Sequence, residues 1–557
     1  MTEVSKTIEV IIENNNSRKS YPKSITLGEI AEDQAIKLNY PVIGALVNNK
    51  LRELSYDLYK PKSIKFVDMS HPIGYRMYAR SVAFMMYKAV KDIWPDAILR
   101  IEHSVANGWF CGLEIKGVNL THEVAEKIEA RMREIVAEDI PFRRSEIPTS
   151  EAVALFRNLG LEEKASLFEY RTDHYSSVYH LNGLNNYFYG YLVQSTGLLS
   201  TFAIEPYNHG LLLRLPVLGK PEMINQPLKQ EKLFRIFREH KKWVNILGVP
   251  YVGNLNQAIA TGNDSDLIKV AEALHEKKIA RIADKIDKRG GVKLVLISGP
   301  SSSGKTTFSK RLGVQLTVLG YRVSTISLDD YFVNRELTPR DENGEYDFET
   351  IKAIDVKLFN DHLSQLIDGK EVTIPKFDFT TGQRTLNGHK LQLKKNGILV
   401  VEGIHGLNPE LTSSIDASQK FGIFVSALTQ IAIDSQNPIP TTDNRLIRRI
   451  VRDFRHRNYS ALETIKRWPS VRKGEELYIF PYQENADVMF NSALFYELAV
   501  LKSYAEPVLR EVQQNAPEYA EAYRLLKFIS YFKNMSLKEV PPTSILREFL
   551  EGSSFIY

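Results

Sequence analysis

The stretch GPSSSGKTT, residues 299–307, decides how the rest of this chain is interpreted. An apolar run from Val292 to Ile297 precedes it, and apolar residues with helical spacing, among them Phe308 and Leu312, follow it. This order of strand, loop and helix is the context that a phosphate-binding loop requires. We therefore expect residues 299–307, called the phosphate loop below, to join a strand to a helix and to bind phosphate.

Each residue type in the phosphate loop has a chemical reason. Gly299 and Gly304 permit a tight turn that directs backbone N–H groups at an anion, and the start of the following helix adds to the attraction. Lys305 would reach the β- and γ-phosphates of ATP, and the Thr306 hydroxyl would ligate Mg²⁺. The predicted ATP-binding residues are Gly299, Ser301, Ser302, Ser303, Gly304, Lys305, Thr306 and Thr307.

Length and composition limit the classes of protein to consider. At about 150 residues per domain, 557 residues predict three or four domains. The 72 basic and 67 acidic residues nearly balance, so net charge does not indicate a nucleic-acid-binding protein. Cys111 is the one cysteine, which excludes an intramolecular disulfide and fits a reducing compartment. Neither a secretory signal nor an apolar stretch near the roughly 20 residues of a membrane span is found, so we expect a cytoplasmic protein.

Two further short strands are expected to end in acidic residues. Residues 322–327 lead into Asp329 and Asp330, and residues 397–401 lead into Glu402. Ligands gather beyond the carboxyl ends of parallel strands, where an acid can accept a hydroxyl proton or hold Mg²⁺. We expect Glu402 to bind the metal or its water. In an extended strand end, Asp329 and Asp330 would point to opposite sides.

The segment DNRLIRRIVRDFRHR predicts an amphipathic helix with a basic face. Its apolar residues, including Phe454, would lie on the opposite face. Arginine offers forked donors that match phosphate oxygens, although a solvated basic face is the alternative. The predicted phosphate-facing residues are Arg445, Arg448, Arg449, Arg452 and Arg455.

These motifs, in this order, resemble the uridine kinase and phosphoribulokinase family of P-loop kinases, and uridine-cytidine kinases most closely. The resemblance covers about 210 residues and implies an α/β fold with a parallel sheet flanked by helices, with ATP as co-substrate and Mg²⁺ as cofactor. It places the catalytic aspartate at Asp329, beside Lys305, and the arginine helix in the lid region. The substrate-binding residues that it implies are Asp347, Phe377, Asp378 and Arg384, within motifs that include Asp355 and residues 374–379.

Two departures from this family lie in its nucleoside pocket. Phe377 stands where the family has a tyrosine, and Gly382 stands where it has a histidine. The identity of the base is therefore left open.

The N-terminal residues resemble a different family. Residues 6–13 alternate in part, residues 26–38 have helical spacing, and residues 44–54 predict a hairpin that turns at Asn48 and Asn49. This α+β unit resembles a TGS domain, the ubiquitin-like module of threonyl-tRNA synthetases and some GTPases.

Residues 79–95 and 107–110 resemble the α+β editing-type domain that follows TGS in threonyl-tRNA synthetases. That family carries an HxxxH pair and a later CxxxH, whose counterpart here lies near residues 180–184. The two histidine positions fall at Arg80 and Phe84, which are not zinc ligands. We therefore expect no zinc, and a domain that binds or regulates without editing.

The predicted domain limits are 1–68 for the TGS-like domain, 69–225 for the editing-like domain, 226–289 for a helical connector, 290–505 for the kinase domain and 506–557 for a helical tail. No chemistry is assigned to the tail.

Together these patterns indicate an ATP- and Mg²⁺-dependent kinase that phosphorylates the 5′-hydroxyl of a nucleoside. Two alternatives stay open: a nucleotide-dependent, RNA-associated switch, and a kinase for another sugar or sugar phosphate. RNA or a regulatory ligand is a candidate partner of the N-terminal half, a membrane is not expected, and the oligomeric state is open.

Overall fold

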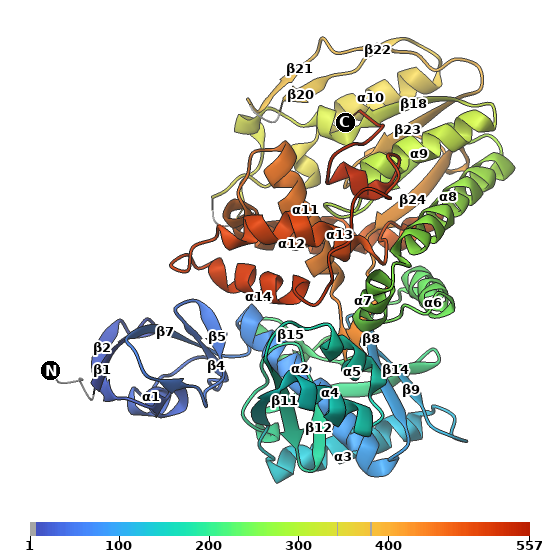
Figure 1. Ribbon diagram of the computed structural model, residues 1–557. Coiled ribbons are helices and arrows are strands. Elements are labelled where there is room, and N and C mark those ends of the chain that lie inside the picture. Colours follow the sequence, from blue (N-terminus) through green and yellow to red (C-terminus); the bar gives the residue numbers. More distant parts are fainter. Residues whose placement is uncertain (1–6, 342–343, 379–380, 557) are drawn as a thin grey trace.

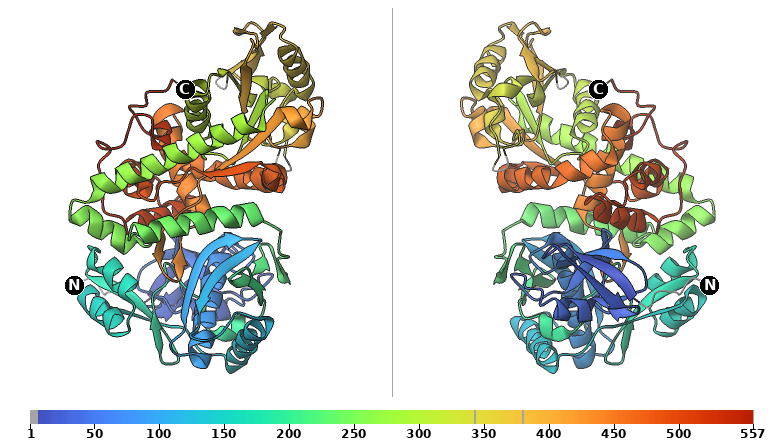
Figure 2. Two further views of the ribbon diagram at one scale, coloured as in Figure 1. Left: turned by 90° about the vertical axis from the view of Figure 1, so that its right-hand side faces the viewer. Right: turned by 90° about the vertical axis from the view of Figure 1, so that its left-hand side faces the viewer.

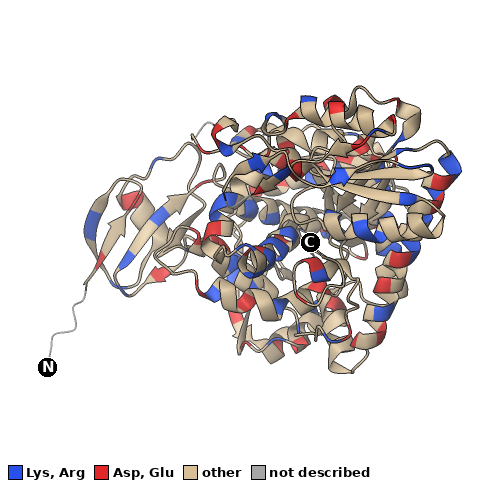
Figure 3. Ribbon diagram, turned by 90° about the horizontal axis from the view of Figure 1, so that it is seen from above, with Lys and Arg blue, Asp and Glu red and all other residues tan. Residues whose placement is uncertain are grey.

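The computed structural model describes residues 7–341, 344–378 and 381–556, so Phe379 of the predicted substrate motif lies outside the described residues. Figure 1 shows an N-terminal sheet at one side, a second α+β part beneath, and the part that carries the phosphate loop above. Basic and acidic residues are intermixed along the ribbon, in keeping with the small net charge (Figure 3). Among the described residues, no helix combines the length and apolar character that crossing a bilayer needs.

The N-terminal sheet has the strand order β2-β1-β7-β4-β5. Alternate residues of β1, Ile8, Val10 and Ile12, are buried beneath the short helix α1. Asn48 and Asn49 both have positive φ, as a two-residue hairpin turn requires, which confirms the predicted hairpin. The predicted helix over residues 26–38 is shorter in the structure. The bounds are β1 Thr7–Ile12, β2 Ser17–Pro22, β3 Ile25–Thr26, α1 Leu27–Asp33, β4 Gly44–Val47, β5 Lys50–Arg52, β6 Asp57–Leu58 and β7 Lys62–Val67.

The second part packs α2 and α3 against a sheet of order β13-β14-β9-β8, beside a smaller sheet of order β10-β11-β12. Helix α2 is buried over most of its length, because the sheets cover it on several sides. The bounds are α2 Pro72–Ile93, β8 Ile98–Val105, β9 Gly108–Glu114, α3 His122–Glu138, β10 Arg143–Pro148, α4 Thr149–Asn158, α5 Glu162–Glu169, β11 Tyr175–Leu181, β12 Leu184–Asn186, β13 Ala203–Tyr207, β14 Gly210–Arg214, β15 Pro216–Val217 and β16 Lys220–Ile224.

The predicted connector consists of helices that lie between the two halves (Figure 2). The bounds are α6 Glu231–Ile246, α7 Val252–Ala260 and α8 Asp264–Arg289. Ile279, Ile282 and Ile286 of α8 belong to the same buried cluster as the phosphate-loop strand, so this helix packs as part of the kinase core. Val270 of α8 is 41% exposed.

The sheet of the predicted kinase domain has the order β18-β23-β17-β24-β27, and each neighbouring pair is parallel. Leu294 and Leu296 of β17 face one buried cluster, which includes α10, whereas Val295 and Ile297 face the other, which includes α8 and α9. Burial on both faces explains the continuous apolar runs. The bounds are β17 Leu294–Ser298, α9 Lys305–Val318, β18 Arg322–Ser327, α10 Val356–Ile367, β19 Val372–Thr373, β20 Lys376–Asp378, β21 Gln383–Thr385, β22 Lys390–Leu391, β23 Gly397–Glu402, β24 Lys420–Ser426, β25 Ala432–Asp434, β26 Asn437–Pro438, α11 Thr441–His456, α12 Ala461–Tyr478 and β27 Val488–Asn491.

The C-terminal segment returns to both halves of the molecule. It contains α13 (Glu497–Arg510), α14 (Tyr519–Ile529) and the 3₁₀ turn η8 (Ile545–Glu548). Lys50 in β5 lies over the ring of Tyr523 in α14, and the Asn49 amide donates to the Gln514 carbonyl at 3.0 Å. The N-terminal hairpin therefore docks on this segment.

Buried polar contacts also join the editing-like region to the kinase half. Lys164 of α5 and Asp434 of β25 form an ion pair of 2.7 Å, and both side chains are fully buried. Phe156 and Phe168 lie in the same apolar cluster as the kinase core. The two regions thus share a core, and the domain limits stay predictions.

Candidate active site

The phosphate loop needs glycine at two positions for identifiable reasons. At Gly299, a Cβ atom would lie 1.9 Å from the Val425 carbonyl oxygen, because the loop passes close over the end of β24. Gly304 precedes α9 with φ of +80°, which residues with a Cβ rarely adopt. The loop thus joins β17 to α9 as the sequence predicts.

Lys305 lies at the centre of the site. Its Nζ donates to the carbonyl oxygens of Gly299 at 2.9 Å and Pro300 at 3.1 Å. Burial lowers the pKa of Lys305, and the nearby carboxylates of Glu402 and Asp329 partly offset this shift. The predicted lysine at the start of α9, the predicted metal-binding carboxylate at the end of β23 and the predicted catalytic aspartate just after β18 are therefore brought together.

Glu402 is the last residue of β23, and its Oε1 accepts from the hydroxyls of Thr306 at 3.3 Å and Ser327 at 3.4 Å. Burial raises the pKa of Glu402 to about 7, with Asp329 contributing and Lys305 opposing. Hydroxyl and carboxylate oxygens are the ligands that Mg²⁺ prefers, so Thr306 and Glu402 fit a site for this ion.

Asp329 and Asp330 lie on a 3₁₀ turn, η2 (Leu328–Tyr331), so the expected extended conformation is wrong. The Ser327 hydroxyl caps the turn by accepting from the Asp329 N–H at 3.3 Å. Burial raises the pKa of Asp329, while Lys305, Arg457 and Arg452 oppose this shift. The Asp330 carboxylate instead accepts from the Phe377 N–H at 3.5 Å. The two aspartates therefore face different neighbours, as predicted. The cause is the 3₁₀ turn and not an extended strand end.

The arginine helix is α11, but its arginines do not form one phosphate-facing stripe, and this part of the prediction needs correction. Arg445 is buried and paired with Glu475 of α12, with Nη2 and Oε2 at 2.7 Å. Its Nη1 donates to the Ser301 carbonyl at 3.1 Å. Burial opposes ionisation of Glu475, but Arg445 and Arg472 hold its pKa below the ordinary value. Arg445 thus links the backbone of the phosphate loop to α12.

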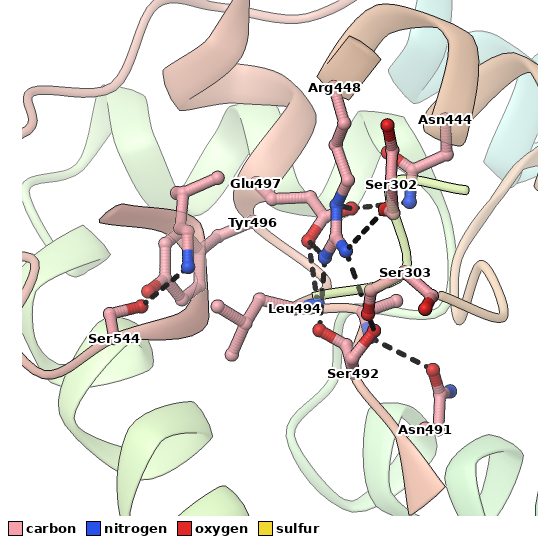
Figure 4. Close-up of polar contacts among 12 residues, drawn as sticks. Ser302, Ser303, Asn444, Arg448, Asn491, Ser492, Leu494, Tyr496, Glu497 and Ser544 are labelled. Atoms are coloured by element: carbon pink, nitrogen blue, oxygen red, sulfur yellow. Dashed lines mark hydrogen bonds and ion pairs between the residues drawn. The ribbon is translucent and has the colours of Figure 1, made fainter. Parts of the chain in front are cut away.

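Arg448 is also buried and serves the same part of the loop (Figure 4). Its guanidinium pairs with Glu497 of α13, with Nη2 and Oε2 at 2.5 Å, and donates to the Ser492 carbonyl at 3.0 Å. Nη1 lies 3.4 Å from the Ser302 carbonyl oxygen, and the Ser492 hydroxyl donates to Ser303. A buried polar network therefore holds the loop backbone in place.

The remaining arginines of α11 differ from one another. Arg449 donates to the Ser301 hydroxyl at 2.8 Å, and Arg452 pairs with Asp453 at 2.7 Å while acting on the pKa of Asp329. Arg455 pairs with Glu551. Phe454, placed on the apolar face from sequence, is 43% exposed. Arg449 therefore contacts a side chain of the loop and Arg452 lies near the predicted catalytic aspartate, whereas Arg445 and Arg448 contact loop carbonyls.

The predicted substrate residues lie beyond η2. Arg384 pairs with Asp355 at 3.0 Å, and Phe377 is buried beside Phe332. The Asp378 carbonyl accepts from Gly382 at 2.7 Å. Asp347 lies earlier in the chain than these residues, and its Oδ1 accepts from the Glu349 N–H at 3.0 Å.

Gly382 has a neighbour that sequence reasoning missed. A Cβ at this glycine would lie 2.7 to 2.8 Å from Nε and Cζ of Arg335, whose N–H donates to the Gly382 carbonyl at 2.9 Å. Arg335 thus packs at the position where related kinases are expected to carry histidine.

Other residues of the site carry no sequence motif. Burial raises the pKa of Glu349 to about 7, with Arg449 opposing, and within the described residues its Oε2 is buried without a hydrogen-bond partner. Glu475, Glu497 and Glu548 each contact the loop or its supporting arginines from distant helices. A single sequence offers no local pattern that would have found them.

In the N-terminal half, the positions of the expected HxxxH pair have other roles. Arg80 donates through Nε and Nη2 to the Tyr191 carbonyl, and Phe84 packs against Phe142 and Phe188. Gly190 leaves the space into which the Arg80 guanidinium fits.

Comparison with known proteins finds matches in two parts of the chain. Residues 294–497 match the model of the Phosphoribulokinase / Uridine kinase family. The N-terminal part is similar to threonine--tRNA ligases. The ligase of Methylobacillus flagellatus is 29% identical over 191 residues, which are 34% of this chain and 30% of the ligase. The chain therefore spans less than a third of the length of these relatives.

Solved structures similar to the chain include two kinases. A putative fructose transport system kinase from Silicibacter sp. TM1040 is 18% identical with a TM-score of 0.30, over 38% of this chain and 98% of that one. A possible uridine kinase from Bacillus stearothermophilus is 19% identical with a TM-score of 0.28, over 39% and 98%.

Proposed function

We propose that this protein is an ATP-dependent kinase that transfers the γ-phosphate to the 5′-hydroxyl of a nucleoside. The observation that carries the proposal is the convergence of Lys305, Asp329 and Glu402 at the phosphate loop, each close enough to shift the pKa of another. A loop that only bound nucleotide would not need a carboxylate such as Asp329 beside Lys305, because there would be no acceptor hydroxyl to deprotonate.

Each residue of the site has its own role in the proposed reaction. Loop N–H groups and Lys305 bind the ATP phosphates, and Thr306 and Glu402 hold Mg²⁺, which neutralises phosphate charge when bound. Asp329 orients the acceptor hydroxyl and takes its proton as the oxygen bonds to the γ-phosphorus, while the bond from this phosphorus to the β–γ bridging oxygen breaks. ADP is the leaving group. Arg449 and Arg452 stand beside the loop and balance the spreading negative charge.

The nucleoside is the proposed acceptor because Asp347, Asp378 and Arg384 match the family motifs, whereas Phe377 replaces the tyrosine of the family. The Tyr hydroxyl and the His expected in the base pocket are absent, and Arg335 packs at Gly382. A site that lacks hydrogen-bond donors for a group of the substrate discriminates poorly between substrates that carry this group and substrates that lack it. We therefore expect pyrimidine nucleosides to be preferred over purine nucleosides by much less than about 10⁴-fold.

Lys305→Ala and Thr306→Ala should each abolish phosphate transfer while the fold stays intact, because both side chains serve phosphate and metal at the start of α9. Wild type and both variants are incubated with ATP, Mg²⁺ and a panel of nucleosides, ribulose phosphate and RNA, and ADP and phosphorylated products are identified. Circular dichroism checks the fold.

Near-normal ADP release by Lys305→Ala would contradict the assignment. Wild-type transfer to ribulose phosphate alone would replace the nucleoside with a sugar phosphate.

A nucleotide-dependent, RNA-associated switch is a second candidate. It is favoured by the similarity of the N-terminal part to threonine--tRNA ligases and by the docking of the β4–β5 hairpin on the C-terminal segment. The same panel separates the two, because a switch would hydrolyse ATP without any phosphorylated acceptor and respond to RNA.

A further inference from the structure

A carboxylate from the C-terminal segment is bound at the phosphate loop. Glu548, the last residue of η8, accepts through Oε2 from the Thr307 N–H at 3.0 Å and from the Thr307 hydroxyl at 2.8 Å. Thr307 is the third residue of α9, and N–H groups in the first turn of a helix have no partner within the helix. Glu548 therefore occupies donors that the fold leaves for an anion.

These donors are ones that a nucleotide needs. Phosphate loops bind nucleotides through backbone N–H groups at the start of the following helix, where the helix dipole also favours negative charge. The Glu548 carboxylate has the same sign of charge as a phosphate, and it acts on Lys305 and Glu402 as a third carboxylate of the site. It cannot share the Thr307 donors with a phosphate oxygen without repulsion.

The residues around Glu548 hold it in this position. Ile545 packs on the loop, since a Cβ at Gly304 would lie 2.5 Å from its Cγ2 atom. Phe549 is buried, and the Arg448 guanidinium lies 4.9 Å from the centre of its ring. The Ser544 hydroxyl donates to Glu272 at 2.5 Å, and the Tyr496 hydroxyl donates to the same glutamate at 2.8 Å. Figure 4 shows Ser544 beside Tyr496. The turn is thus anchored on both sides of a half-buried glutamate.

We propose that Glu548 is a built-in competitor of the nucleotide phosphates, so that the C-terminal segment lowers the affinity of the phosphate loop for ATP. The proposal deepens the proposed function, because it requires only that the loop binds nucleotide. Binding of ATP displaces the carboxylate from Thr307 while the apolar anchors keep the turn docked. A structural role for Glu548 as a helix cap predicts the opposite sign, because its loss would then loosen α9 and weaken nucleotide binding.

The test compares full-length wild type with Glu548→Ala and Glu548→Gln. Glu539→Gln is the matched control, because Glu539 is exposed in the same segment and its substitution removes the same charge. The affinity for ATP with Mg²⁺ is measured by calorimetry, and the thermal shift at a fixed ATP concentration gives a second readout. Glu548→Gln keeps the shape of the side chain, which guards against misfolding of the alanine variant.

We expect Glu548→Ala to bind ATP about 10- to 100-fold more tightly, the range for losing a competing charged hydrogen bond, and Glu548→Gln to bind it more tightly by a smaller factor. Glu539→Gln should match wild type. Equal or weaker binding by both Glu548 variants overturns the proposal, as does an absence of ATP binding in all forms. Tighter binding without transfer to any acceptor would support the role of Glu548 and contradict only the proposed kinase reaction.

Discussion

Asp329 and Asp330 are adjacent on η2, yet only Asp329 is coupled to Lys305. The loose transition state of phosphoryl transfer asks the base mainly to orient the attacking hydroxyl. Asp329→Asn should therefore retain ATP binding and lower kcat by about 10² to 10⁴, the usual range for a positioned general base. Asp330→Asn should lower kcat by a much smaller factor. Steady-state kinetics with an ATP-binding assay check both, and an inactive Asp330 variant beside a normal Asp329 variant would move the base to Asp330.

Glu349 makes stability depend on pH in a defined direction. A glutamate in the unfolded chain loses its proton near pH 4.5, whereas burial keeps Glu349 protonated up to about pH 7. Between these values the folded state binds the extra proton, so the free energy of unfolding falls as pH rises through this window. Glu349→Gln should remove this fall and gain stability relative to wild type from about pH 4.5 to pH 7, with no further change above.

Urea denaturation at several pH values within and above this window measures the effect. Glu345→Gln is the control, because Glu345 is exposed nearby and should leave the pH dependence unchanged. A stability difference between Glu349→Gln and wild type that does not vary with pH would show that Glu349 titrates normally.

At the scale of elements, α11 and α13 are joined to the phosphate loop by the buried pair of Arg448 and Glu497. Removing one partner of a buried ion pair leaves the other charge without compensation, which costs about 3–5 kcal/mol. Arg448→Met should destabilise the protein by this amount and weaken ATP binding, since the Ser302 and Ser492 carbonyls lose their donor. Urea unfolding and calorimetry measure the two effects.

Arg455→Met is the matched control for Arg448→Met. It removes an arginine from the same helix, but its pair with Glu551 is more exposed, and such pairs contribute about 0–1 kcal/mol. Equal destabilisation by the two variants would mean that the buried network adds nothing.

At the scale of the whole molecule, the N-terminal part is similar in sequence to threonine--tRNA ligases but carries other residues at the expected metal-binding positions. We predict that it binds no stoichiometric zinc and does not hydrolyse mischarged tRNA, because Arg80 and Phe84 lack metal-binding atoms and are committed to Tyr191 and to aromatic packing. Elemental analysis of the full-length protein, purified without chelator, tests this. One zinc per chain, or release of the amino acid from mischarged tRNA, would contradict it.

The parts of the site that the sequence alone determined are those encoded by short contiguous patterns. The phosphate loop needs two glycines, a lysine and a threonine within nine residues, and Glu402 follows a recognisable apolar strand. Burial on both faces makes such a strand visible without any knowledge of its neighbours. The hairpin was predicted from the turn residues Asn48 and Asn49, and the parallel sheet was implied by the family resemblance.

Only the tertiary structure decided which charges face the site. Spacing placed Arg445 and Arg448 on one helix face, but packing buried them against Glu475 and Glu497 and left Arg449 and Arg452 beside the loop. Glu548 meets Thr307 across 241 positions of sequence, and Arg335 reaches Gly382 through an unrelated turn. Such contacts depend on how helices and turns pack. The partner of a charged side chain is therefore set by the tertiary structure and not by its neighbours in the sequence.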